Sequence, residues 1–305
     1  DARKFLDHIM AGRLPKPGRI SLSPMLSYRG KLCGDLTVAC LDENEFMVFG
    51  SGAAQEMHRR WFESHLDKFN LSYKNRSDEF HGLSIAGPNS RKVLEKIVRD
   101  DVSNEKFKFR DSRRMFVGGV PAIINRISFT GELGYEIYVA PHYQLKLYEE
   151  LMEAGKEFNI KPFGGRALMS MRLEKNWGAW TLDYRPDFTA KETGLDAFIN
   201  WDKEFIGKES AQKENSSNKL VPLIVETNEI DVTNNEAVLN GDQSIGYVTS
   251  GGFAHFVNKS VAFTFVDQKN IKSENKIQVE INGDLFNCSI IKEPLYDPSG
   301  QKMRS

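Results

Sequence analysis

Strand-forming runs in this 305-residue chain come close together, joined by turns too short to hold a helix. GDLTVACL and EFMVFGS are separated only by residues 42–44, and further strand runs lie in MFVGGVPAIINRISF and YEIYVA. Parallel strands need a crossover of a dozen or more residues, whereas antiparallel strands can be joined by a tight turn. We therefore expect an α+β protein with antiparallel sheets rather than a parallel βαβ sheet.

Helical spacing of apolar residues appears between these strand runs. It predicts helices over residues 1–10, 53–69, 89–98 and 143–154, and another in GGRALMSMRLEKN. In the helix over 53–69, Met57, Trp61 and Phe62 share the face that we expect to cover a sheet, and His58 lies mostly off that face.

The composition changes near residues 211–219, where AQKENSSNK forms a polar stretch that is typical of a linker. Short strand runs follow it, with turn signals at Asn240–Gly241 and Asn282–Gly283. This spacing predicts a small all-β sandwich or barrel. The predicted domains are residues 1–215 and residues 216–305.

Charge and cysteine content exclude several classes of protein. The chain has 41 Lys plus Arg and 42 Asp plus Glu, a formal charge of −1, so we expect no nucleic-acid partner. Three cysteines without a C-x-x-C pair favour neither a zinc site nor a disulfide scaffold and suit a reducing compartment. The sequence lacks an apolar run of about 18 residues, so no membrane partner is expected.

Familiar catalytic signatures are missing from the sequence. GSGAAQ lacks the third glycine of the dinucleotide fingerprint, and the sequence contains no P-loop and no G-x-S-x-G elbow. The histidines never form a metal-binding spacing, so we predict no metal site. An enzyme of this kind would depend on carboxylates and on a ligand with its own reactivity.

Asp35 is the first candidate carboxylate. It lies at the start of the strand run DLTVACL beside Gly34, whose missing side chain lets a ligand approach the backbone. An aspartate with an ordinary pKa is ionised at neutral pH and suits stabilising a cation or orienting an amine. The alternative is an aspartate that caps a turn.

Glu136 is the second candidate. It lies in SFTGELGYEIYV, at the start of a strand in which Tyr135, Ile137 and Val139 are mostly apolar. If it faces inward, its carboxylate can accept two hydrogen bonds from a flat, amidine-like ring edge such as a pterin or purine presents. The alternative is a glutamate that faces solvent.

Arg172 and two tryptophans are weaker candidates. Arg172 lies on the predicted helix in GGRALMSMRLEKN, where charged residues usually form surface pairs. Trp177 and Trp180 lie in NWGAWTLDYRPDF, a segment that either covers a ligand or packs in the core.

The order of these motifs along the chain resembles that of the folate-dependent aminomethyltransferase family, which comprises the T-protein of the glycine cleavage system and its relatives. The resemblance covers about residues 1–294 and rests on GKLCGDLTV, HGLSIAGPNSRKVLEKI, SFTGELGYEIYV, MRLEKN, TAKETGLDAFINWDKEFIGKESA, IGYVTSGGF and KSVAFTFV. RLEKNWGAW followed by ETGLDAFI is more similar still to the carboxy-terminal folate-binding portion of dimethylglycine and sarcosine dehydrogenases.

The resemblance implies a three-lobed fold around a central folate channel, with a C-terminal β-barrel as the third lobe. It implies tetrahydrofolate as the cofactor, Asp35 as the catalytic carboxylate near the reactive folate nitrogens, and Glu136 as the group that binds the pterin edge. Phe129, Tyr135 and Arg172 are the other residues expected to bind the cofactor.

Departures from the glycine-cleavage pattern favour the dehydrogenase-linked branch. Gly34 replaces the first aspartate of D-D-L-I-V, and Phe129 stands where Y-T-G-E has its tyrosine. Leu22 replaces another usual tyrosine, and Leu168 replaces an arginine.

The dehydrogenase branch normally carries an amino-terminal FAD domain, so we expect this chain to be the carboxy-terminal part of a longer flavoprotein. The expected reaction is capture of an iminium- or formaldehyde-level carbon from an N-methyl amine such as dimethylglycine or sarcosine, or from an aminomethyl donor, giving 5,10-methylenetetrahydrofolate. The alternatives are methyl transfer by a demethylase of similar fold and a stand-alone glycine cleavage aminomethyltransferase.

A folate-binding iron–sulfur assembly factor ranks last, because its K-G-C-[YF]-x-G-Q signature is missing near FIGKES. We expect a cytoplasmic location, or the mitochondrial matrix in a eukaryote.

Overall fold

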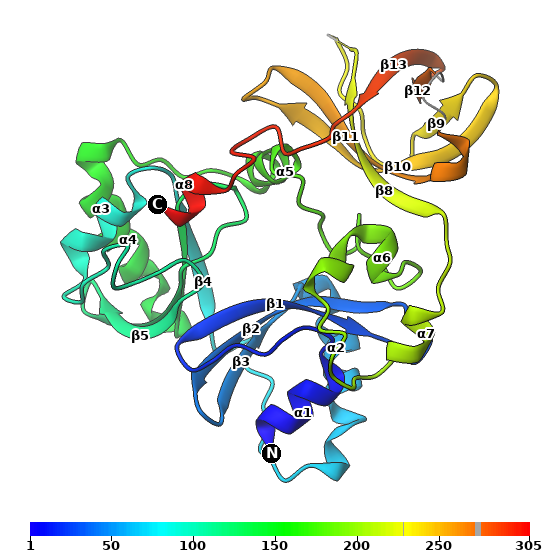
Figure 1. The fold of residues 1–305 in the computed structure, drawn as a ribbon. Helices are drawn as coiled ribbons and strands as arrows, with labels where there is room; N and C mark the ends of the chain where they lie inside the picture. The colour runs from blue at the N-terminus through cyan, green and yellow to red at the C-terminus, as the bar shows by residue number, and fades with distance from the viewer. Residues whose placement is uncertain (228, 272–275) are drawn as a thin grey trace.

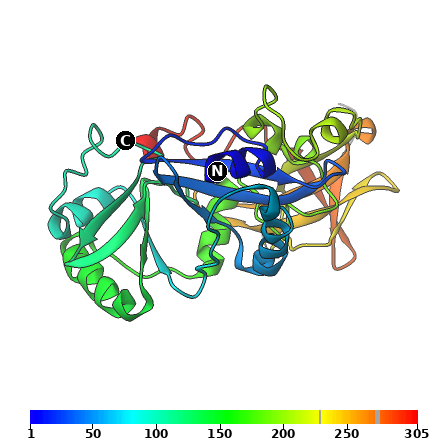
Figure 2. The same cartoon turned by 90° about the horizontal axis from the view of Figure 1, so that it is seen from below.

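The computed structural model describes residues 1–227, 229–271 and 276–305 and shows three lobes (Figure 1). Two lobes are antiparallel sheets with helices, and the third is a closed β-barrel. In both views the second lobe lies at the left and the barrel at the right, with the first lobe toward the centre (Figures 1 and 2). The expected α+β class with antiparallel sheets and a C-terminal barrel is confirmed.

The first lobe is a sheet in the order β1-β2-β3, formed by β1 (Arg19–Leu26), β2 (Leu32–Asp42) and β3 (Glu45–Phe49). The tight connection at residues 43–44 makes β2 and β3 a hairpin, as predicted. Helices α1 (Ala2–Ile9) and α2 (Gln55–Glu63) cover one face, where Leu36 and Val38 pack against Phe5 and Phe62.

Helix α2 is shorter than the predicted helix over residues 53–69. It is flanked by the 3-10 turns Gly52–Ala54 and Leu66–Lys68. The Ser64 hydroxyl donates to the Trp61 carbonyl at 2.9 Å, and the His65 imidazole bonds to the same oxygen at 2.7 Å. Side chains that bond to a nearby carbonyl compete with the helical ladder, so the helix ends there.

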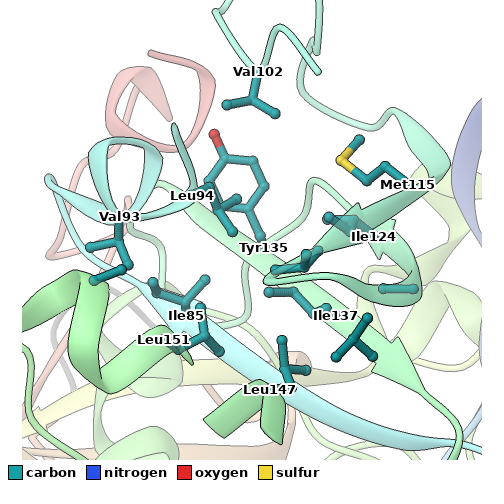
Figure 3. Packing of buried hydrophobic residues seen from close by; sticks show 14 of the residues in the cluster. Ile85, Val93, Leu94, Val102, Met115, Ile124, Tyr135, Ile137, Leu147 and Leu151 are labelled. Atoms are coloured by element: carbon teal, nitrogen blue, oxygen red, sulfur yellow. The ribbon is translucent and has the colours of Figure 1, made fainter. Parts of the chain in front are cut away.

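The second lobe is a sheet in the order β4-β7-β6-β5. Its strands are β4 (His81–Ala86), β5 (Ser112–Val117), β6 (Val120–Asn125) and β7 (Gly134–Val139). Gly118 and Gly119, with φ of 56° and 79°, form the two-residue turn between β5 and β6 that favours glycine. Helices α3 (Ser90–Ile97) and α4 (Gln144–Gly155) bury the apolar core of this lobe against the sheet (Figure 3).

Helix α5 (Gly165–Glu174) lies between the second lobe and the barrel (Figure 1). The short helices α6 (Ala190–Thr193) and α7 (Lys208–Gln212) follow on the way to the barrel. Helix α7 ends within the predicted linker, and the first barrel strand begins at Asn218. The division between residues 215 and 216 stays a prediction.

The third lobe closes in the order β10-β11-β8-β13-β12-β9. Its strands are β8 (Asn218–Val225), β9 (Ala237–Asn240), β10 (Gln243–Ala254), β11 (Lys259–Asp267), β12 (Ile277–Ile281) and β13 (Asp284–Ile290). Gly241, Asn282 and Gly283 have positive φ in the predicted turns. Closure leaves no open edge in the barrel. The chain then returns to the second lobe, where α8 (Gln301–Arg304) lies (Figure 1).

Candidate functional site

Asp35 lies in the first half of β2, on the face of the sheet turned away from α1 and α2. Its neighbour Leu36 packs against those helices. Because side chains alternate along a strand, Asp35 points to the other face, where it is half-buried. The structure therefore places the carboxylate on the side of the sheet that the two helices leave free.

Burial changes the charge state of Asp35. It raises the pKa of the carboxyl to about 7, and a hydrogen bond from the residue's own backbone N–H offsets this only in part. Near neutral pH the group is therefore divided between its protonated and ionised forms. The expectation of an ordinary, fully ionised aspartate is wrong for the protein alone, because the surrounding chain displaces the water that would solvate the charge.

Glu136 lies on β7 and points away from the core of the second lobe. It is half-buried, and the Tyr138 hydroxyl donates to its Oε2 at 2.6 Å. Burial raises the pKa of Glu136, and the bond from Tyr138 opposes that rise. In the part of the chain that the structure describes, no other donor to this carboxylate is found, so one oxygen is left for a ligand.

Tyr135 does not belong to this site. Its side chain is fully buried in the core of the second lobe, together with Leu94 and Val102 (Figure 3). Adjacent residues of a strand face opposite sides, so Tyr135 and Glu136 cannot both face a ligand. This placement corrects the prediction that Tyr135 binds the cofactor.

The strands that carry the two carboxylates are connected through one aromatic pair, Phe49 and Tyr138. Phe49 pairs with Thr37, which lies on the same face of β2 as Asp35. The Phe49 ring packs against Tyr138 with centroids 4.5 Å apart, and Tyr138 in turn holds Glu136. One aromatic contact thus joins the face that carries Asp35 to the strand that carries Glu136.

A cavity of about 570 Å³ adjoins this contact, between β3, α2 and residues 71–80. Phe49, Tyr138 and His58 line it, whereas Asp35 and Glu136 lie outside its lining. Tyr138 therefore belongs both to the wall of this cavity and to the hydrogen bond of Glu136.

Phe129 lies in the loop that precedes β7. It is half-buried and stacks on Trp177, with ring centroids 6.1 Å apart and planes 24° apart. Trp180, by contrast, is buried in a core cluster with Phe188 and Leu32, so its role is packing. The role of the Phe129–Trp177 pair stays a prediction.

Arg172 forms a buried ion pair instead of reaching a ligand. It is 1% exposed and donates to Asp183 Oδ2 at 2.5 Å and to the Trp177 carbonyl at 3.0 Å. Asp183 also accepts hydrogen bonds from Thr249 and Ser250 on β10, at 2.5 and 2.7 Å. The pair therefore links α5 to the barrel.

This placement corrects two expectations for Arg172. It is neither a cofactor ligand nor a member of a surface charge pair. The reason is that the last turn of α5 is enclosed between the second lobe and the barrel, so Glu174 and Lys175 are buried there as well.

Tyr138 and His58 are the residues that sequence reasoning missed. The signal for Tyr138 was present, because a residue two positions after Glu136 on a strand shares its face. His58 is buried although its helix position suggested otherwise, and its imidazole bonds to the Cys33 carbonyl at 3.0 Å. This contact forms because α2 packs close to β2 in the folded protein, which the local sequence around His58 does not predict.

Among the described residues there is no group of three or more His, Cys, Asp or Glu that could hold a metal ion. No helix within the same residues is long and apolar enough to cross a membrane.

Two family profiles match most of the chain. The GCVT N-terminal domain matches residues 1–203, and the Glycine cleavage T-protein C-terminal barrel domain matches residues 218–297.

Curated relatives carry two kinds of name. Human mitochondrial dimethylglycine dehydrogenase is 35% identical over 303 residues, which are 97% of this chain and 35% of that protein. The aminomethyltransferase of Thermoanaerobacter pseudethanolicus is 28% identical over 99% of this chain and 83% of its own length. The chain thus spans about a third of the length of the dimethylglycine dehydrogenase that it matches.

A solved structure has the same fold. The glycine cleavage system aminomethyltransferase T from Bartonella henselae superposes with a TM-score of 0.84, over 97% of this chain and 81% of that chain, at 22% identity. This similarity confirms the predicted three-lobed, aminomethyltransferase-like fold.

Proposed function

This chain belongs to the glycine cleavage T-protein family, and from that membership we propose that it transfers a one-carbon unit to tetrahydrofolate. Its relatives named as aminomethyltransferase and dimethylglycine dehydrogenase are enzymes, which supports an enzymatic role. The one-carbon unit is at the iminium or formaldehyde level, and the product is 5,10-methylenetetrahydrofolate.

A single observation carries the proposal. Asp35 and Glu136 are both desolvated carboxylates, and no described residue of opposite charge lowers the pKa of either one. A buried carboxylate without a cation or enough donors is costly to keep, so two of them, on strands joined by the Phe49–Tyr138 contact, support a ligand rich in N–H groups. A reduced pterin, which carries an amino group beside ring nitrogens, has this chemistry.

In the proposed complex, Glu136 accepts hydrogen bonds from the N–H edge of the pterin ring. Tyr138 fixes the orientation of the Glu136 carboxylate through Oε2, which leaves the other oxygen to the ligand. Charge-assisted hydrogen bonds of this kind contribute about 1.5 to 3 kcal/mol each. Phe129 and Trp177 offer aromatic faces to the flat ring system.

Tetrahydrofolate, when bound, supplies the nucleophilic nitrogens that accept the one-carbon unit. Asp35 is the residue of this chain that we assign to the reaction. With a pKa of about 7 it can hold or release a proton at neutral pH. A positive charge that develops nearby favours the ionised carboxylate, and in a site shielded from water this stabilisation contributes about 3 kcal/mol.

The donor and the molecular context are further proposals. The similarity to dimethylglycine dehydrogenase supports an N-methyl amine such as dimethylglycine as the carbon source. Because the chain spans 35% of that relative, we propose that an FAD-containing part of the same polypeptide oxidises the amine. The mitochondrial location in the name of this relative supports a mitochondrial location in a eukaryote, and we propose the matrix.

The test compares the wild-type full-length protein with its Asp35→Asn variant. Calorimetry should show that tetrahydrofolate binds both proteins with similar affinity, and rapid-quench assays should show slower formation of methylenetetrahydrofolate by the variant. Equal transfer rates with folate bound would exclude the proposed role of Asp35, and absence of folate binding to either protein would exclude the function. Asp202→Asn, at an exposed position, is the matched control.

A further inference from the structure

The part of β2 that carries Asp35 has an unpaired edge. β1 runs along one side of β2 and pairs Pro24 with Asp35 and Met25 with Gly34. On the other side, β3 pairs with β2 only from Thr37 onward. The Leu32 N–H donates to the Phe188 carbonyl at 2.8 Å, and between that bond and Thr37 the described chain gives residues 33–36 no strand partner on this second side.

His58 from α2 bonds to this unpaired edge. Its Nε2 lies 3.0 Å from the Cys33 carbonyl oxygen, two residues before Asp35. A carbonyl can only accept, so Nε2 carries the hydrogen and donates it. Burial lowers the pKa of His58, in keeping with a neutral ring. Among the described residues, His58 is the only side chain from another element that bonds to the backbone of residues 33–35.

Two glycines make room for the imidazole. A Cβ on Gly34 would lie 2.9 Å from Nε2, and a Cβ on Gly50 would lie 2.9 Å from Nδ1. These distances are too short for a side chain at either position unless the ring moves. The glycine at position 34, where the resemblance expects an aspartate, is therefore matched by a histidine that fills the space beside it.

We infer that His58 is a positioning residue for Asp35, holding the unpaired edge of β2 so that the carboxylate keeps a fixed direction. The positioning of Asp35 by His58 is a structural inference; only the expected effect of His58 on the rate of one-carbon transfer rests on the proposed function. Asp35 lies on the opposite face of the strand from the imidazole, so His58 acts through the backbone and does not touch the ligand. A shift of about 1 Å in a reacting group can slow a reaction about 100-fold, so one backbone bond next to Asp35 is enough to matter.

The first experiment measures turnover in the full-length protein. His58→Leu removes the donor, and His58→Gln keeps an N–H group at a similar distance. We expect His58→Leu to lower kcat about 10- to 100-fold with KM for tetrahydrofolate nearly unchanged, and His58→Gln to restore most of the rate. In an Asp35→Asn background, His58→Leu should have little further effect. An equal slowing in both backgrounds, or no rescue by His58→Gln, would overturn the inference.

The second experiment does not depend on activity. Amide hydrogen exchange should show faster exchange at Asp35 in His58→Leu and recovery in His58→Gln, while Ala39, which pairs with strands on both sides, stays protected. Equal loss of protection at both residues would indicate general destabilisation and refute the positioning role, as would unchanged exchange at Asp35. If His58→Leu does not fold, Gly34→Ala takes its place, since its Cβ would press on the ring.

The two experiments separate the two proposals. If Asp35→Asn leaves turnover unchanged, the proposed catalytic role of Asp35 fails, and the exchange measurement still decides whether His58 positions it.

Discussion

The raised pKa of Asp35 predicts that the folded protein loses stability as the pH rises toward neutrality. Burial takes the pKa of this carboxyl from an ordinary 3.8 to about 7. Between these values the folded protein keeps a proton that the unfolded chain has released. The contribution of Asp35 to the free energy of unfolding therefore falls through this window and reaches its lowest value above the folded pKa.

Asp35→Asn removes this titration while keeping the shape of the side chain. Each pH unit between the two pKa values corresponds to 1.36 kcal/mol, so the full difference amounts to about 4 kcal/mol. The free energy of unfolding of the variant should equal that of the wild type below about pH 4 and should exceed it by about 4 kcal/mol at pH 8.

The assay is urea unfolding of both proteins at a series of pH values, without ligand. Asp202→Asn is the control, because it replaces an exposed carboxylate that forms no ion pair among the described residues. The free energy of unfolding of this control should differ little from that of the wild type at every pH. A difference between wild type and Asp35→Asn that stays below about 1 kcal/mol at every pH would show that Asp35 is well solvated and would refute the reasoning.

Three further substitutions test other parts of the structure. Arg172→Met should lower the free energy of unfolding by about 3 to 5 kcal/mol in urea titrations, because Asp183 would stay buried without its cation; a loss below about 1 kcal/mol would contradict the buried pair. Glu136→Gln should raise the dissociation constant for tetrahydrofolate about 10- to 100-fold in calorimetry while the protein stays folded, and equal affinity would remove Glu136 from the proposed site. Gly207→Ala should destabilise the protein by about 2 kcal/mol or more in the same unfolding assay, since φ is +84° and the added Cβ would collide with the Ser27 carbonyl; a neutral result would show that this turn can rearrange.

Local patterns in the sequence determined much of the architecture. The tight turn between β2 and β3 and the glycine-containing turns of the barrel are short-range features, because turn chemistry and strand alternation depend on a few neighbouring residues. The order of motifs also predicted the family, which the profile matches confirm.

The candidate site was predictable only in part. Asp35 and Glu136 were chosen from the sequence; the structure half-buries both, and their common role at one site stays a prediction. Strand alternation implied that Tyr135 and Glu136 face opposite ways, but which of the two faces the core depends on where α3 and α4 pack.

Only the tertiary structure decided the pKa of Asp35 and the partners that Arg172 and His58 find in distant parts of the sequence. Arg172 meets Asp183, which in turn bonds to Thr249 on the barrel, and His58 meets Cys33 from another element. The pKa of Asp35 depends on how much water the folded chain displaces around it. Burial and desolvation are set by segments distant in sequence, so no local pattern of residues contains them.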